Sequence, residues 1–421
     1  MHALIVTFGS HGDLYPFLAI GRALERRGHR CTLLTDRFFA ADVASAGLEM
    51  RSLPEAISIE KLWRHPHLFH RFHGPALLMR RFDSGTQPLT EALRHGISAC
   101  APDLVLAHHI ALPAGWIAGE QGIPCATAVL APFAWNAPDD PVPVLQSAPG
   151  AWRRRQARAL AGVLDPVLRS ACDAWVNGLR TRTGFPPARN ALWGGFRGGG
   201  LNLALWSSAF RPPLPSDPPR GAICGFPRYD GDPGARLDED LERFLAAGEP
   251  PVVFTLGSAA VHTAAGFFAI AAQTCARLGL RGVLLIGPGN TPPPALPRDV
   301  IAAPWAPHSL LFPRALVNVH HGGIGTSAQA LRAGRPALVI PHAYDQFNNA
   351  VRVATLGTGL MLARHRVTAA RLEERLKRSI GDASITARAE EFSRRLADED
   401  GASVAAGHLE RLVGSGRRMA A

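Results

Sequence analysis

Short apolar runs that end at glycine or proline recur along the chain and alternate with stretches of helical periodicity. The first run, residues 2–8, ends at Gly9, and the helical face that follows carries Phe17, Leu18 and Leu24. Such runs are typical of parallel strands that helices bury on both faces. The sequence therefore predicts α/β domains with parallel strands. The predicted strands are residues 2–8, 31–35, 103–107, 125–130, 252–256, 282–286, 300–303, 316–320 and 337–340, with a loop at 9–16.

The length of the chain predicts two domains. A single core rarely extends beyond about 250 to 300 residues, and this chain has 421. Residues 210–236 are rich in proline, glycine and aspartate, which is typical of a linker. We predict an N-terminal domain at 1–215 and a C-terminal domain at 216–421, with the last helix packing back on the N-terminal domain.

The net charge of +11 comes from arginine, because Lys61 and Lys377 are the only lysines. The densest basic run, residues 153–155, has no aromatic ladder beside it and belongs to no nucleic-acid-binding motif. The interpretation that we favour is compositional bias on a solvated face, with loose association to a membrane surface as the alternative. We expect no nucleic-acid partner.

The cysteines and the N-terminus indicate a cytoplasmic protein. Six separated cysteines form no C-x-x-C pair, and residues 2–8 resemble a strand rather than a signal peptide. Peripheral association with the inner membrane remains an alternative. Residues 251–276 carry no charge, but Gly257 and Ser258 divide them into a strand and a helix, so we expect no transmembrane segment.

The strongest local signal for a ligand is a glycine-rich turn between the predicted strand 316–320 and a helix. Glycines allow close backbone approach, and the N–H groups at a helix N-terminus attract phosphate. His321 and Thr326 add donors there. Asp345 and Gln346 follow the strand 337–340 and could bind a polyol, or Asp345 could cap the next helix. Trp305 on a proline-flanked loop could stack on a base or lie in the core.

Three motifs carry a resemblance: Trp305-Ala-Pro-His308, the turn from His321 to Thr326, and Asp345-Gln346. They resemble the nucleotide-sugar signature of the family 1 glycosyltransferases of GT-B fold. The opening stretch at residues 9–16 is similar to the bacterial branch of that family. Within the branch, residues 225–231, 253–258 and 345–349 resemble the catalytic rhamnosyltransferases of rhamnolipid synthesis.

The resemblance implies two doubly wound Rossmann-like domains that face each other across a cleft, and an inverting, metal-independent hexosyltransferase. The donor would be a UDP- or dTDP-sugar, and the acceptor a hydrophobic small molecule or lipid. Asp13 would be the general base, with no cofactor and no metal. The implied donor-binding residues are Ser258, Trp305, His308, His321, Gly323, Gly325, Thr326, Gln329, Asp345 and Gln346.

Some residues depart from the family pattern or lie outside it. Gln329 stands where many members have a glutamate that binds the ribose, and it can make only neutral hydrogen bonds. The histidine-rich tract at 65–73 could hold a metal, but we favour an acceptor-facing segment that includes Phe69 and Phe72. His109 is a further candidate for acceptor binding.

Two other functions remain open from the residues alone. A nicotinamide oxidoreductase would use Asp36 at the end of the second strand to bind ribose, although the first turn, from Gly9 to Gly12, lacks the G-x-G-x-x-G spacing. A non-catalytic nucleotide-sugar-binding partner is the second alternative, and a base at Asp13 argues against it.

Overall fold

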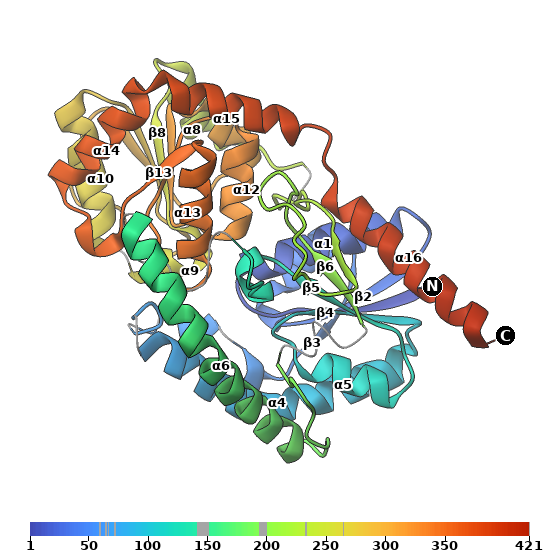
Figure 1. Ribbon diagram of the computed structural model, residues 1–421. Helices are drawn as coiled ribbons and strands as arrows, with labels where there is room; N and C mark the ends of the chain where they lie inside the picture. The colour runs from blue at the N-terminus through green and yellow to red at the C-terminus, as the bar shows by residue number, and fades with distance from the viewer. Residues whose placement is uncertain are drawn as a thin grey trace. The chain divides into compact units, whose positions relative to one another are not determined.

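A computed structural model describes residues 1–58, 60–63, 65, 67–70, 73–140, 151–192, 200–231, 234–263 and 265–420. The chain forms two compact units (Figure 1). Unit 1 contains Met1–Lys61, Phe72–Tyr229 and Asp400–Ala421, and unit 2 contains Leu62–Arg71 and Asp230–Glu399. The predicted α/β class is confirmed in both units.

Unit 1 is built on a parallel sheet with the strand order β3-β2-β1-β4-β5-β6-β7. The strands are β1 (His2–Val6), β2 (Arg30–Thr35), β3 (Glu49–Ser52), β4 (Leu104–His108), β5 (Cys125–Val129), β6 (Leu201–Ala204) and β7 (Gly221–Ile223). The helices are α1 (His11–Glu25), α2 (Ala40–Ser45), α4 (His73–Cys100), α5 (Pro113–Glu120), α6 (Ala151–Arg182) and α16 (Gly401–Ala420), and α3 (Glu60–Trp63) spans the junction with unit 2.

Unit 2 repeats the design with a parallel sheet of order β10-β9-β8-β11-β12-β13. Its strands are β8 (Val252–Thr255), β9 (Gly282–Leu285), β10 (Val300–Ala303), β11 (Val317–His320), β12 (Ala337–Val339) and β13 (Gly359–Met361). Its helices are α8 (Glu239–Ala246), α9 (Gly257–Ala260), α10 (Ala265–Leu278), α11 (His308–Leu311), α12 (Ile324–Arg332), α13 (Gln346–Leu356), α14 (Ala369–Gly381) and α15 (Ala383–Arg395). Short 3₁₀ turns are η1 (Arg37–Phe39), η2 (Glu55–Ile57), η3 (Pro132–Trp135), η4 (Val261–Thr263), η5 (Phe312–Arg314) and η6 (Arg364–Arg366).

The apolar strands predicted from sequence form the cores of both units. In unit 1, Leu4 and Val105 pack with Leu93 of α4 and Ile117 of α5. In unit 2, Val253 and Val283 belong to one cluster with side chains of α8 and α11. The uncharged stretch 251–276 becomes β8, α9, η4 and α10, and none of the helices that the structure describes is long and apolar enough to cross a membrane.

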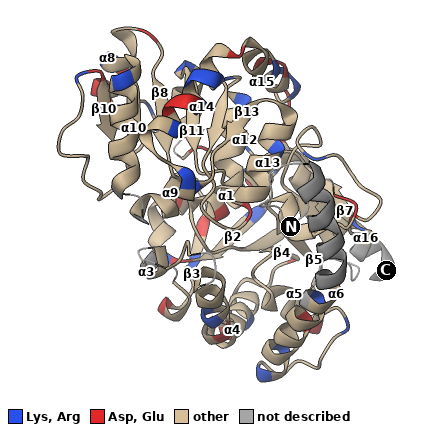
Figure 2. Cartoon of the chain, turned by 60° about the vertical axis from the view of Figure 1, so that its left-hand side comes forward, with Lys and Arg blue, Asp and Glu red and all other residues tan. Residues whose placement is uncertain are grey.

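Basic residues are distributed over several helices, among them α4, α8 and α15, on the face that Figure 2 shows. The arginines at 153–155 lie in α6, and their side chains are outside the described part of the chain. This distribution is consistent with a solvated surface that reflects compositional bias.

Helix α1 starts earlier than predicted. Residues 9–16 were expected to form a loop, but the helix begins at His11 and includes Pro16. Ser10 is the N-cap, and its backbone N–H donates to Asp13 Oδ2 at 2.7 Å. This capping interaction stabilises the first turn. Pro16 has no N–H to donate to the carbonyl of Gly12, four residues earlier.

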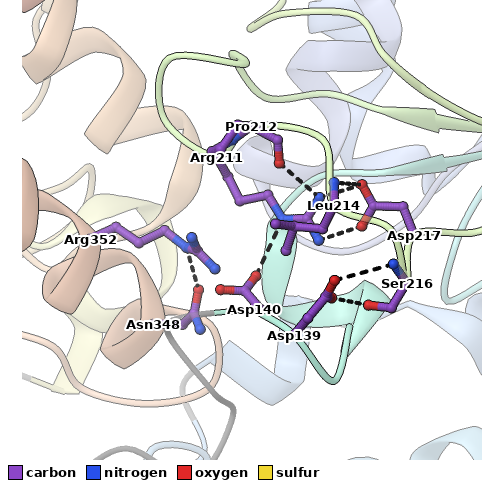
Figure 3. A network of polar contacts seen from close by, with 9 residues as sticks. All are labelled: Asp139, Asp140, Arg211, Pro212, Leu214, Ser216, Asp217, Asn348 and Arg352. Carbon is purple, nitrogen blue, oxygen red and sulfur yellow. Dashed lines mark hydrogen bonds and ion pairs between the residues drawn. The ribbon is translucent and has the colours of Figure 1, made fainter.

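The domain boundary also differs from the prediction, because residues 210–229 belong to unit 1 and not to a linker. Arg211 is fully buried and forms ion pairs with Asp140, 3.3 Å from Nε, and with Asp217 (Figure 3). Its guanidinium lies 5.6 Å from the centre of the Trp135 ring. These contacts fix the proline-rich stretch to unit 1, and β7 then extends the sheet of that unit. The last helix, α16, also belongs to unit 1, where Glu410 pairs with Arg27 of the loop after α1.

We predict that Arg211→Leu lowers the free energy of unfolding by about 3 to 5 kcal/mol, because it leaves two carboxylates buried without their cation. The measurement is urea unfolding at pH 7. The matched control is Arg243→Leu, which removes an ion pair with Asp240 at the surface, where the Arg243 side chain is 71% exposed. This control should lower the free energy of unfolding by less than about 1 kcal/mol. Equal effects of the two substitutions would contradict a structural role for the buried network.

Candidate active site

Both sheets have a position where the strand order reverses direction, and the candidate residues follow the strands at these positions. In unit 1, β1 lies between β2 and β4, and in unit 2, β8 lies between β9 and β11. Ligands of doubly wound sheets bind at such points, beside the carboxyl ends of the strands. Asp13 follows β1, and His108 ends β4. Ser258 follows β8, and His321 follows β11.

The carboxylate of Asp13 is held by three groups. Its Oδ2 accepts hydrogen bonds from the backbone N–H of Ser10, at 2.7 Å, and from the Ser10 hydroxyl, at 2.9 Å. Its Oδ1 lies 3.3 Å from Nε2 of His108, and the Asp13 side chain stays 30% exposed. Burial raises the pKa of Asp13, but the His108 and Ser10 contacts outweigh it and hold the pKa below its ordinary value.

The tautomer of His108 follows from its second contact. Its Nδ1 accepts the backbone N–H of Ile110 at 3.2 Å, so in the neutral ring the proton is on Nε2, the atom that faces Asp13. His109 stacks on His108 with ring centres 4.4 Å apart, and burial lowers the pKa of His109 to about 3. Sequence reasoning missed His108, although it directly follows the predicted strand 103–107.

Aromatic rings surround His11, two residues before Asp13. The ring of His11 has edge contacts with Tyr15, Phe38 and Phe39, at centre distances of 5.4, 5.9 and 5.2 Å, and its Nε2 lies 3.6 Å from Asp42. Phe38 is 42% exposed. The structure therefore places the exposed apolar ring of Phe38 beside the first turn of α1, which carries the candidate base, and the sequence did not reveal this contact.

Asp36 has a structural role. It is 8% exposed, caps η1, and accepts the backbone N–H of Phe38 at 2.9 Å. The carboxylate that suggested a ribose site in a nicotinamide enzyme is thus engaged in stabilising a turn.

The ring of His321 fills a space that two glycines leave open. A Cβ atom on Gly257 would lie 2.4 Å from this ring, and one on Gly323 would lie 2.5 Å from it. Nδ1 of His321 is buried, and no hydrogen-bond partner for it occurs among the residues that the structure describes. Burial and the neighbouring histidines His320, His342 and His308 keep the pKa of His321 well below its ordinary value.

Helix α12 begins next to His321, with Gly323 at its N-cap. The first N–H groups of a helix have no partner within the helix, and no side chain in the described part of the chain caps α12. Thr326 and Gln329 are half-buried on this helix, and Gly325 is exposed. The first N–H groups of α12 thus have no side-chain cap within the described ranges, and their binding of an anion stays a prediction.

Trp305 is an exposed loop residue, 43% accessible, and not a core residue. His308, three residues later, stacks on Phe312 with ring centres 4.3 Å apart. The indole is thus open to solvent, while His308 supports the turn that follows it.

Asp345 and Gln346 begin α13, and both also hold the local backbone. Gln346 Oε1 accepts the N–H groups of His342 and Ala343, at 2.8 and 3.1 Å, so only its amide N–H groups remain for a ligand. Nδ2 of the fully buried Asn349 donates to Asp345 Oδ2 at 2.8 Å and to the Gly322 carbonyl at 2.9 Å. Asn349, which the sequence analysis did not single out, therefore connects Asp345 to the glycine-rich turn.

The predicted acceptor residues have different outcomes. Phe69 is 8% exposed and lies in unit 2, and Phe72 lies outside the described residues. The ring centres of His65 and His67 lie 5.7 Å apart, and those of His67 and His70 lie 6.1 Å apart. Among the described residues, no group of three or more His, Cys, Asp or Glu side chains could hold a metal ion.

Comparison with known proteins identifies the family. Residues 3–91 match the glycosyltransferase family 28 N-terminal domain, and residues 290–411 match the C-terminal domain of erythromycin biosynthesis protein CIII-like proteins. O-mycaminosyltylonolide 6-deoxyallosyltransferase of Streptomyces fradiae is 30% identical over 423 residues, which cover 95% of either chain. L-demethylnoviosyl transferase of Streptomyces niveus is 28% identical, over 95% of this chain and 94% of that protein.

Solved structures show the same fold. The glycotransferase of kitacinnamycin superposes with a TM-score of 0.75 at 24% identity, over 98% of this chain and 99% of that chain. The glycosyltransferase VinC, solved with dTDP, superposes with a TM-score of 0.71 at 21% identity, over 99% and 100%.

The chain belongs to the family 1 glycosyltransferases of GT-B fold, and it is a glycosyltransferase. The fold prediction is confirmed. The two alternative predictions, that the chain is a nicotinamide oxidoreductase or a non-catalytic nucleotide-sugar-binding partner, are wrong. The finer resemblance to the rhamnosyltransferases of rhamnolipid synthesis stays a prediction, as do the individual roles of the candidate residues.

The buried histidines of unit 2 predict a loss of stability in acid. Burial, with a smaller effect of His308, lowers the pKa of His320 to about 3, and burial and Arg364 lower that of His342 to about 4. An unfolded histidine has a pKa of about 6.5. Below that pH the unfolded chain binds protons that the folded chain excludes, so stability decreases as the pH falls. We expect a loss of about 2 kcal/mol per histidine by pH 5, measured by urea unfolding at pH 7.5 and pH 5.

Two variants test the source of this pH dependence. His320→Asn should reduce the pH dependence of the free energy of unfolding, because it removes a side chain that takes up a proton only when the chain unfolds. His365→Asn, at an exposed position, should leave the pH dependence unchanged. If both variants keep the wild-type slope, His320 does not contribute to it.

Proposed function

We propose that this glycosyltransferase moves a hexose or deoxyhexose from a dTDP- or UDP-sugar to a hydroxyl group of a hydrophobic acceptor. The transfer is a single displacement that inverts the anomeric configuration and uses no metal ion. Asp13 removes the proton of the attacking hydroxyl. The observation that carries the proposal is the placement of a partly exposed, ionised carboxylate at the strand-order reversal of unit 1.

The tautomer of His108 supports Asp13 as the final proton acceptor. Because Nε2 of the neutral ring carries a proton and Nδ1 is occupied by the Ile110 N–H, His108 cannot take a second proton from Asp13 without breaking that hydrogen bond. His108 therefore orients the carboxylate. A carboxylate with a lowered pKa is a weak base, so the proton moves as the new bond forms.

The donor site that we propose lies in unit 2. The N-terminus of α12 and His321 stabilise the charge that develops on the departing diphosphate, and Trp305 stacks on the pyrimidine. The neutral imidazole of His321 donates a hydrogen bond to phosphate, with Ser258 and Thr326 adding hydroxyls. Asp345 and the amide N–H groups of Gln346 bind sugar hydroxyls, and Gln329 binds the ribose.

Two features support the nature of the ligands. A structural neighbour was solved with dTDP, and the relative from Streptomyces fradiae is named for 6-deoxyallosyl transfer, which favours a dTDP-deoxysugar. The exposed Phe38 and the rings around His11 favour an apolar acceptor near Asp13. The groups proposed to bind the diphosphate are His321, backbone N–H groups and two hydroxyls, which suits a reaction in which no Mg²⁺ bridges the diphosphate.

We predict that Asp13→Asn lowers the transfer rate about 10²- to 10⁴-fold while donor binding stays nearly unchanged. Asparagine can still accept the Ser10 N–H and keep the cap of α1, so thermal stability should stay close to that of the wild type. The rate is measured with saturating donor and with an acceptor found by turnover.

His11→Asn is the competing variant, because His11 lies two residues before Asp13 in the first turn of α1. Wild-type turnover in Asp13→Asn together with a large loss in His11→Asn would assign the base to His11. A loss of stability in Asp13→Asn as large as that in Asp13→Ala would indicate a structural carboxylate.

A further inference from the structure

A short segment from the N-terminal half of the chain belongs to unit 2. Residues Leu62–Arg71 are part of that unit, whereas the residues before and after them belong to unit 1. The structure describes 62, 63, 65 and 67–70 of this segment. Trp63, Leu68 and Phe69 are its buried apolar residues, at 5%, 5% and 8% exposure. We refer to residues 62–70 as the inserted segment.

The inserted segment contacts the loop that precedes Asp345. The hydroxyl of Tyr344 donates a hydrogen bond to the Leu68 carbonyl at 2.6 Å. The ring of Phe69 has centre distances of 6.4 Å to both Tyr344 and His342. Burial raises the pKa of Tyr344 to about 12, so the hydroxyl keeps its proton and remains a donor at physiological pH.

Tyr344 has a backbone conformation that its residue type rarely adopts. Its φ is +55°, in the left-handed region that disfavours bulky side chains. Such conformations persist only where the surrounding contacts determine them, and they are common at ligand sites. The contacts with Leu68 and Phe69, together with the hydrogen bonds that Gln346 accepts from His342 and Ala343, hold Tyr344 and the start of α13 in place.

Tyr344 is followed directly by a residue of the proposed donor site. Asp345 follows Tyr344 directly, and Asn349 connects the Asp345 carboxylate to the Gly322 carbonyl. Trp305 and His321 lie on other loops. A change at Tyr344 therefore acts directly on Asp345, and it reaches the turn proposed to bind the diphosphate indirectly, through Asn349.

We propose that Tyr344 is a positioning residue for the sugar half of the donor: anchored on the inserted segment, it fixes the Asp345 carboxylate for binding to the sugar hydroxyls. This inference rests on the proposed function, in which Asp345 contacts the sugar. It also changes the interpretation of Phe69, which packs against Tyr344 and His342 and supports the donor loop instead of facing the acceptor.

The test is Tyr344→Phe, which removes the hydroxyl and keeps the ring. Calorimetry compares the affinity for UDP and dTDP with that for UDP-glucose and dTDP-glucose. We expect the sugar nucleotide that the wild type binds to be weakened about three- to tenfold, the effect of one hydrogen bond. The affinity for the bare diphosphate should stay within about twofold.

Thr274→Val is the matched control. It also removes a buried hydroxyl that donates to a backbone carbonyl of unit 2, at Ile270 in α10, away from the donor loop. This variant should leave all four affinities unchanged. A purely structural role of the Tyr344 hydroxyl would lower thermal stability without separating the two kinds of ligand.

The outcomes are distinct. Unchanged affinity for the sugar nucleotide in Tyr344→Phe, or equal weakening of the diphosphate and the sugar nucleotide, would overturn the role of Tyr344. A wild-type protein that binds none of the four ligands would contradict the proposed function itself.

Discussion

The absence of side chains at three glycines is the constraint on which both candidate ligand sites depend. A Cβ atom at Gly9 would lie 2.4 Å from Asp13 Oδ2, and Cβ atoms at Gly257 and Gly323 would lie about as close to the ring of His321. Gly9 and Gly257 also have positive φ, at +133° and +69°. In unit 1, Gly9 follows β1 and leaves room for Asp13, the proposed base. In unit 2, Gly257 follows β8 and leaves room for His321, which is proposed to bind the diphosphate of the donor.

The electrostatics of the two sites differ because their partners differ. Asp13 is stabilised as an anion by a backbone N–H, a hydroxyl and an imidazole N–H, which overcome the cost of its burial. Burial, with smaller effects of the neighbouring histidines, keeps the pKa of His321 well below its ordinary value, so its ring is neutral before any ligand binds. The negative charge of a diphosphate would then be met by backbone N–H groups and the positive end of α12, which need no reorganisation when the donor arrives.

The sequence predicted the fold class, the buried strands and the glycine-rich turns, because these depend on local periodicity and on residue types. It missed four strands: β3, whose residues Glu49–Ser52 are mostly polar, and the short strands β6, β7 and β13. It misplaced the domain boundary because the prolines after Arg211 resemble a linker, whereas the burial of Arg211 depends on Asp140 and Asp217. Local composition cannot show such a non-local contact.

Among the candidate site residues, the sequence singled out Asp13, His321 and Trp305, which lie in the first turn of α1, directly after β11 and on an exposed loop. His108, Asn349 and Tyr344 were missed for one physical reason, which is that each acts through a neighbour from another strand or segment. His108 reaches Asp13 across two adjacent strands, and Tyr344 contacts Leu68, 276 positions away in the sequence. The aromatic character of the tract around Phe69 was recognised, but its attachment to unit 2 required the structure.

The central claim is that one displacement, assisted by Asp13, transfers the sugar. It is tested most directly by the anomeric configuration of the first product formed from an α-linked dTDP- or UDP-sugar, read from proton NMR coupling constants. The account predicts that the product has the configuration opposite to that of the donor. Retention of the donor's configuration would contradict a single displacement and the role of Asp13 as its base.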